Sequence, residues 1–217
     1  MTTDTLINNL FDLLDDWRSL PAYQLERRAD IFFAIYLKDI IKHKFENEVE
    51  YIIPEFPVRK GHLAEPEVSS DNLSFKIDYL AVSESSKTVF LIELKTDNLS
   101  IRKDQKETME KIGKFDISIL TDSVLKISKA SKSIKYEALI NKLTEMGWLD
   151  KEGKIVSKQD YTIKVVYIKP SFNDKTDIGL DIITFKEVID SISQREDSLT
   201  QRFIKSLERW QPSEQEK

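Results

Sequence analysis

The chain has 217 residues, 40% hydrophobic and 33% charged, which is enough for one domain with a sizeable core. It has no cysteine, which excludes a disulfide framework, a thiol nucleophile and a zinc site built on thiolates. Because His43 and His62 are its only histidines, a metal site must consist mostly of carboxylates, and such oxygen ligands favour Mg²⁺ or Mn²⁺. The net charge of −5 counts mildly against nucleic-acid binding, although the local distribution of charge matters more than the sum.

The N-terminal segment MTTDTLINNLFDLLDD is acidic and amphipathic. It lacks the basic region and the apolar core of a signal peptide. No apolar run in the chain approaches the length needed to span a membrane. We therefore expect a cytoplasmic protein with no membrane partner.

Two helices are predicted at the start of the chain. Leucines at positions 6, 10, 13 and 14, with Trp17, recur at helical spacing up to Leu20-Pro21. A second helix is predicted over residues 22–44, and its apolar stripe comprises Leu25, Ala29, Phe32, Phe33, Tyr36 and Ile40. Residues 51–58 (YIIPEFPV) are extended, and their two prolines confine them to an edge or irregular strand. Residues 59–72 form a polar loop.

A hairpin follows, in which KIDYLAV (76–82) and TVFLIELK (88–95) are the strands. Ser100 is a plausible N-cap for a helix from Ile101, and helical patterning continues to Gly147 with breaks near Gly113 and Thr121-Asp122. Strands are predicted over residues 161–168 and 180–185, and helices over 186–192 and 198–210. This order predicts an α/β protein with a central mixed sheet flanked by helices. We expect a single domain, with N-terminal helices (1–45), a core (50–190) and a C-terminal helix and tail (196–217).

The hairpin carries the most informative residues of the chain. A tight turn centred on Ser85-Ser86 places Asp78 directly across from Glu93. Lys95 lies two residues further on and shares the face of Glu93. Two carboxylates that face each other repel, and the cost rises with burial, but a divalent cation between them would turn the repulsion into a binding site.

The residue types suit phosphodiester hydrolysis. A metal held by Asp78 and Glu93 can polarise a phosphate and lower the pKa of bound water, while Lys95 can orient or deprotonate that water or stabilise charge on the phosphorus. The alternative is a surface salt bridge between Lys95 and one carboxylate. The apolar flanks, the shared face and the helix that starts nearby favour the functional interpretation.

The segment KIDYLAV…VFLIELKTD resembles the catalytic core of the PD-(D/E)xK nuclease superfamily, which has the restriction-endonuclease-like fold. Asp78 matches the aspartate of that motif and Glu93-Leu94-Lys95 its second half, whereas Ile77 stands where the motif has proline. The resemblance covers about residues 55–105. It implies a restriction-endonuclease-like core, dependence on Mg²⁺ (or Mn²⁺) and cleavage of nucleic acid.

The resemblance suggests two further site residues. Many members place a glutamate on an early helix that points at the metal, and Glu26 is the best candidate; its alternative is a contact with Asp30 or a neighbouring arginine. Related nucleases carry a glutamine on the helix after the lysine strand, a position that Gln105 fits, although it can equally be an ordinary surface residue. Glu55 is a rival carboxylate.

Two groups of basic residues are candidate phosphate contacts. The first, Arg102, Lys103 and Lys106, follows the motif. The second, expected on a broad helix flank, comprises Lys126, Lys129, Lys132 and Lys135. The alternative for both groups is a solvated helix face. Tyr136 and Trp148 could stack on bases, but core packing is the stronger expectation for both.

We expect a Mg²⁺-dependent nuclease that acts on nucleic acid, DNA rather than RNA, because most of the resembling families act on DNA. The alternative is a non-catalytic module on the same fold that binds nucleic acid or protein. A purely structural helical adaptor would leave the charges of the hairpin unexplained. The sequence is also compatible with a homodimer or with binding to a protein partner.

Overall fold

The computed structural model describes every residue except 1, 64–73, 98–100, 132, 157–159 and 213–217. The predicted cap at Ser100, Lys132, most of the predicted loop 59–72 and the C-terminal tail lie outside the described residues. Within the described part of the chain, no helix is long and apolar enough to cross a membrane.

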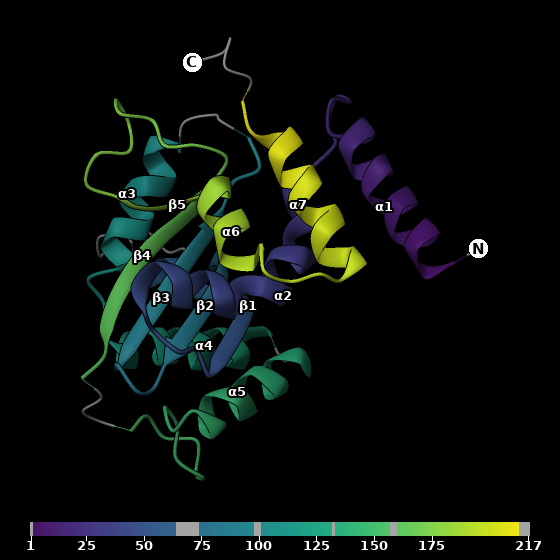
Figure 1. Ribbon diagram of the computed structural model, residues 1–217. Coiled ribbons are helices and arrows are strands. Elements are labelled where there is room, and N and C mark those ends of the chain that lie inside the picture. The colour runs from purple at the N-terminus through teal and green to yellow at the C-terminus, as the bar shows by residue number, and fades with distance from the viewer. Residues whose placement is uncertain (1, 64–73, 98–100, 132, 157–159, 213–217) are drawn as a thin grey trace. The chain divides into compact units, whose positions relative to one another are not determined.

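Among the described residues, five strands form one mixed sheet in sequence order (Figure 1). They are β1 (Tyr51–Arg59), β2 (Ser74–Ser83), β3 (Thr88–Leu94), β4 (Thr162–Lys169) and β5 (Asp181–Thr184). The pairs β1–β2 and β2–β3 are antiparallel, and β4–β5 is parallel. The predicted fold class, an α/β protein with a central mixed sheet and flanking helices, is confirmed, as is the edge position of the proline-containing strand β1.

The chain divides into two compact units. The first comprises Met1–Val49, Glu93–Ser100 and Val166–Lys217, with α1 (Thr3–Trp17), α2 (Leu25–Phe45), α6 (Phe185–Ile192) and α7 (Ser198–Trp210). The second comprises Glu50–Ile92 and Ile101–Val165, with the short 3₁₀ helix η1 (Lys60–His62), α3 (Lys103–Ile112), α4 (Ile117–Ser131) and α5 (Lys135–Glu145).

The helices of the first unit pack around Phe203 of α7. The ring of Phe203 stacks on Tyr36 with 5.6 Å between centroids and meets Phe33 edge-on at 5.2 Å. Phe11 of α1 lies 4.6 Å from Phe32 of α2. The whole predicted apolar stripe of α2 is buried, so the helical periodicity identified the core face correctly. That helix begins at Leu25 rather than at residue 22, because Ala22 has a left-handed backbone with φ of 62°.

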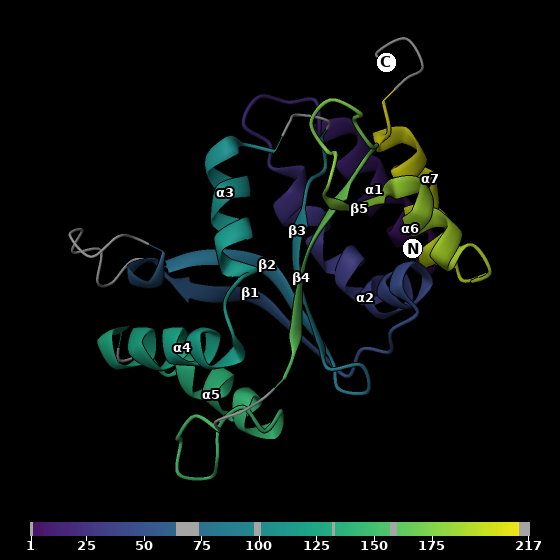
Figure 2. The same ribbon diagram turned by 90° about the vertical axis from the view of Figure 1, so that its left-hand side faces the viewer.

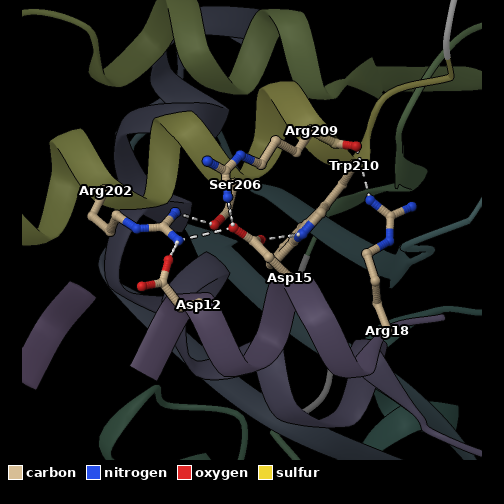
Figure 3. A network of polar contacts seen from close by, with 7 residues as sticks. All are labelled: Asp12, Asp15, Arg18, Arg202, Ser206, Arg209 and Trp210. Atoms are coloured by element: carbon tan, nitrogen blue, oxygen red, sulfur yellow. Dashed lines mark hydrogen bonds and ion pairs between the residues drawn. The ribbon is translucent and has the colours of Figure 1, made fainter. Parts of the chain in front are cut away.

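A network of charged side chains joins α1 to α7 (Figure 3). Asp15 accepts hydrogen bonds from Arg202 at 2.9 Å, Arg209 at 2.8 Å and the indole N–H of Trp210 at 2.8 Å. Arg202 also donates to Asp12 at 2.7 Å. Burial pushes the pKa of Asp15 upward, but the hydrogen bonds from Arg202, Ser206 and Trp210 outweigh it and hold the pKa below its usual value.

We predict that Asp15→Asn lowers the free energy of unfolding by about 2 kcal/mol at neutral pH, because it removes the buried charge partner of Arg202 and leaves that guanidinium only the exposed Asp12. Since the folded-state pKa of Asp15 is depressed, its contribution is complete above the unfolded value of about 3.9 and is lost as the pH falls through the lower folded pKa. Urea denaturation at several pH values measures this. Asp16→Asn, at an exposed neighbour, is the control, and equal loss in both variants would contradict the prediction.

The second unit contains the predicted hairpin. The partners in β2 and β3 run from Tyr79↔Ile92 to Ser83↔Thr88, which is the predicted register, and the turn is centred on Ser85-Ser86. On the other side β2 pairs with β1. Helix α4 packs on β1, and α5 packs on α4 (Figure 2).

Two predicted helix boundaries were wrong. The break expected at Thr121-Asp122 does not occur, because α4 continues through it to Ser131 and the Thr121 hydroxyl donates to the Ile117 carbonyl at 2.7 Å. The helix expected from Ile101 begins at Lys103. The predicted stop at Gly147 is confirmed: this glycine follows Met146, the C-cap residue of α5, and has φ of 71°, a conformation that favours glycine.

Glu55 interrupts the regular backbone of β1. Its φ is 51°, a left-handed conformation that costs a non-glycine residue about 1–3 kcal/mol. The regular partners on either side are Pro54↔Tyr79 and Phe56↔Ile77, so Glu55 and Asp78 occupy the intervening position of the two strands. The Glu55 carboxylate lies 3.0 Å from Lys76 Nζ.

His62 gives this unit a pH-sensitive contact. Its Nε2 lies 3.1 Å from Asp122, which also pairs with Lys126 at 2.7 Å. Burial lowers the pKa of His62, and the positive charges of Lys126 and Arg59 act in the same direction, whereas Asp122 opposes them.

We predict that the free energy of unfolding falls between about pH 7.5 and pH 5.5, because a histidine with a depressed folded pKa is charged more readily in the unfolded chain, whose pKa is about 6.5. His62→Gln should flatten this slope in urea denaturation. His43→Gln, at an exposed site, is the control. If His62→Gln leaves the dependence of the free energy of unfolding on pH unchanged, groups other than His62 cause that dependence.

Candidate active site

Glu93 and Lys95 stand where the buried strand β3 ends. All seven residues of β3 are buried, and Glu93 is the only one of them that carries a charge. The two side chains are two residues apart, which is the spacing that places side chains on one face of an extended strand. The backbone N–H of Lys95 donates to the Ile168 carbonyl of β4 at 2.8 Å and so fixes the chain just beyond β3.

The Lys95 ammonium lies between two carboxylates. Its Nζ is 2.9 Å from Oε1 of Glu93 and 3.5 Å from Oε2 of Glu26. Glu26 is the second residue of α2, where the positive end of the helix dipole favours a carboxylate. The structure therefore brings together three of the predicted site residues from two elements that are distant in the sequence.

These three residues, the Glu26–Glu93–Lys95 cluster, include one buried side chain and two that solvent partly reaches. The side chain of Glu93 is 5% exposed, that of Lys95 17% and that of Glu26 35%. A buried carboxylate requires a charge partner, and Lys95 supplies it at hydrogen-bond distance. Glu26, at the open side, is the group of the three that a solute reaches most easily.

The register of the hairpin bears on Asp78. The last pair observed on that side is Tyr79↔Ile92. Asp78 and Glu93 come next in the sequence beyond this pair, and their predicted pairing stays a prediction. Asp78 is half-buried. Its predicted role as a metal ligand stays a prediction.

The chemistry of the cluster suits a hard divalent cation. Among the described residues there is no group of three or more histidine, cysteine, aspartate or glutamate side chains that could hold a metal ion. Mg²⁺, however, is usually bound through one or two carboxylates, with waters and substrate phosphates completing its shell. The carboxylates of Glu26 and Glu93, which already share one cation in Lys95, fit that requirement.

The first basic group and Gln105 lie around the start of α3. Gln105 is on α3 and half-buried, and nothing in the geometry assigns it a catalytic role. Arg102 and Lys103 are exposed, with nitrogen atoms 3.8 Å from the carboxylates of Asp104 and Glu107 respectively. Such exposed pairs contribute little to stability, so these two side chains remain able to meet a phosphate. Lys106 is half-buried on the same helix.

The second basic group does not lie on one helix, as the sequence had suggested. Lys126 and Lys129 are exposed on α4, which ends at Ser131, and Lys135 begins α5. Lys126 and Lys129 therefore belong to one helix and Lys135 to the next, so they do not form the single broad helix flank that was expected. Lys126 pairs with Asp122 at 2.7 Å. Trp148 is fully buried, in agreement with its expected packing role.

Sequence reasoning missed a buried ion pair at the end of β4. Lys169 follows Ile168, whose carbonyl holds Lys95, and its Nζ lies 2.9 Å from Asp177 with both side chains almost inaccessible. Asp177 also accepts from the backbone N–H of Asn173 at 2.8 Å. This pair fixes the loop after β4. The polar run that follows Lys169 gave no signal of it, because a Lys and an Asp eight residues apart are common.

Comparison of the chain with protein-family models, with curated proteins and with solved structures finds no match. The description of the site therefore comes from this chain's own residues. Its chemistry is that of two carboxylates and one ammonium held together where a buried strand ends.

We predict that Lys95 and Glu93 are energetically coupled. Lys95→Met should destabilise the protein because it leaves the buried Glu93 without its charge partner, and Lys95→Met/Glu93→Gln should recover part of the loss. A double-mutant cycle in urea should give a coupling energy of about 1–3 kcal/mol. Additive losses would show that the ion pair contributes nothing beyond its separate side chains.

Proposed function

We propose that this protein is a Mg²⁺-dependent nuclease of the PD-(D/E)xK type that hydrolyses phosphodiester bonds in nucleic acid, with DNA as the substrate. The observation that carries the proposal is the Lys95 ammonium held between the carboxylates of Glu93 and Glu26. These are the residue types that the chemistry needs. The resemblance to that superfamily implies a glutamate on an early helix that points at the metal, and the contact of Glu26 with Lys95 supports its assignment to that role.

Each residue of the cluster has a definite task in this proposal. A bound Mg²⁺ would polarise the phosphate and lower the pKa of water. Glu93 and Glu26 would hold the ion, with Asp78 as the third carboxylate. Lys95, oriented by Glu93, would orient the attacking water or stabilise negative charge that develops on the phosphate oxygens.

A protein-interaction module without catalysis is the second candidate. It is favoured by large apolar side chains exposed on α1 at spacings of four, three and four residues, namely Leu6, Leu10, Leu13 and Trp17. Such a row is typical of a helix that packs against another helix. The net charge of −5 also suits a protein partner better than a nucleic acid.

We predict that the wild type binds Mn²⁺ or Mg²⁺ in calorimetry and nicks plasmid DNA, and that Asp78→Ala and Glu93→Gln abolish both. Lys95→Ala should retain metal binding but lose at least a hundredfold in cleavage rate, the order expected for one electrostatic group in a transition state. Because Glu93→Gln has nearly the same shape, its loss of activity would not reflect a cavity.

Glu208→Gln, which changes an exposed carboxylate on α7, is the matched control and should behave as wild type. Cleavage that persists in Asp78→Ala and Glu93→Gln would remove the site assignment. Absence of cleavage by the wild type with several DNA substrates, while the α1 surface captures a defined partner, would favour the interaction module.

A further inference from the structure

The second unit contains a cavity of about 580 Å³ between β1 and α5. Pro54 and Ile53 of β1 line one side of it, and Leu139 and Tyr136 of α5 line another. Its volume falls within the range of small-molecule sites, about 300–1,000 Å³. All of its lining residues belong to the second unit, whereas Glu26, Glu93 and Lys95 belong to the first.

The charge of the cavity is opposite to that of the whole protein. Three lysines line it, Lys76, Lys135 and Lys142, against one carboxylate, that of Glu55. The chain as a whole has a net charge of −5. A concave, positively charged surface on an acidic protein concentrates anions locally.

The existing contacts of these lysines can be exchanged for a phosphate. Lys76 pairs with Glu55 at 3.0 Å and Lys142 with Glu145 at 3.5 Å, and all four side chains are more than two-fifths exposed. Exposed pairs of this kind are worth about 0–1 kcal/mol, so their replacement costs little. Lys135 is exposed at the first residue of α5.

Apart from Ser133, the remaining lining is apolar or aromatic. Tyr136 is half-buried beside the exposed Lys135, and Leu139 and Pro54 add apolar surface to the lining. An aromatic base can stack on a tyrosine ring and on such surface, while the lysines meet the phosphate attached to it. A simple inorganic anion would leave the apolar part of the cavity exposed to water, and an apolar ligand would make no ionic contact with the lysines.

We infer that this cavity binds one nucleotide of a single-stranded segment, with its base against Tyr136 and its phosphate on Lys135 and Lys142. The inference rests on the proposed function for the source of that nucleotide, the nucleic-acid substrate. It adds a strand-anchoring site whose residues are all distinct from those assigned to catalysis.

Fluorescence anisotropy with a labelled oligothymidylate of about a dozen nucleotides tests this, in EDTA so that no cleavage occurs. Lys135→Gln/Lys142→Gln should weaken binding at least tenfold and reduce the slope of log affinity against log salt by about 1.4, since each lost phosphate contact removes about 0.7 for a single strand. Lys151→Gln/Lys154→Gln removes the same charge from exposed positions that do not line the cavity and should leave binding unchanged.

Tyr136→Ala separates the base contact from the charge. It should weaken binding of the oligothymidylate about tenfold, as expected for the loss of one stacked base, and leave an abasic strand of the same length unaffected. Equal weakening of both strands would overturn the base contact. Equal behaviour of the cavity variants and the control pair, with urea midpoints confirming that all are folded, would overturn the site.

The proposed function can fail separately from this inference. If wild type does not cleave DNA with Mg²⁺ but the cavity variants lose oligonucleotide binding, the cavity assignment stands and the catalytic one falls. If Glu93→Gln abolishes cleavage while the cavity variants bind as wild type does, the reverse holds.

Discussion

The ion pair between Lys95 and Glu93 is the constraint on which the candidate site depends. A carboxylate that is 5% exposed at the end of a wholly buried strand is costly unless a positive charge is held beside it. The strand supplies that charge two residues later, and a hydrogen bond to β4 fixes the backbone that carries it. Glu26 then approaches the same ammonium from the start of α2. The need to compensate the buried Glu93 therefore explains why two carboxylates and one ammonium meet at this point.

The first unit holds α2 in place by two different means. Aromatic rings around Phe203 exclude water and give the core its shape. The charged network of Asp15 and Arg202 joins α1 to α7 at the edge of this core, where apolar packing alone would not determine how the two helices meet. Because Glu26 belongs to α2, the position of one catalytic candidate depends on residues at both ends of the chain.

The sequence was informative where one physical rule dominated. Strand alternation and an even turn length determined the hairpin register, and helical periodicity identified the buried face of α2. The prediction from sequence failed at Thr121, because threonine can either end a helix or donate a hydrogen bond to a carbonyl in the preceding turn. In the structure the Thr121 hydroxyl donates to the Ile117 carbonyl, and the helix continues. The spacing of the lysines gave no sign that α4 ends at Ser131. The left-handed backbone of Glu55 was not predictable, because such strain is imposed by the surrounding fold.

The even turn between β2 and β3 also limits how this protein can vary. Side chains alternate between the two faces of a strand, so a shift of β3 by one residue against β2 would turn every β3 side chain to the opposite face. Glu93 and Lys95 would turn together, away from Glu26. A residue added or removed between Ser83 and Thr88 is therefore compatible with the Glu26–Glu93–Lys95 cluster only where a bulge or a longer loop absorbs it without a shift of the paired strands.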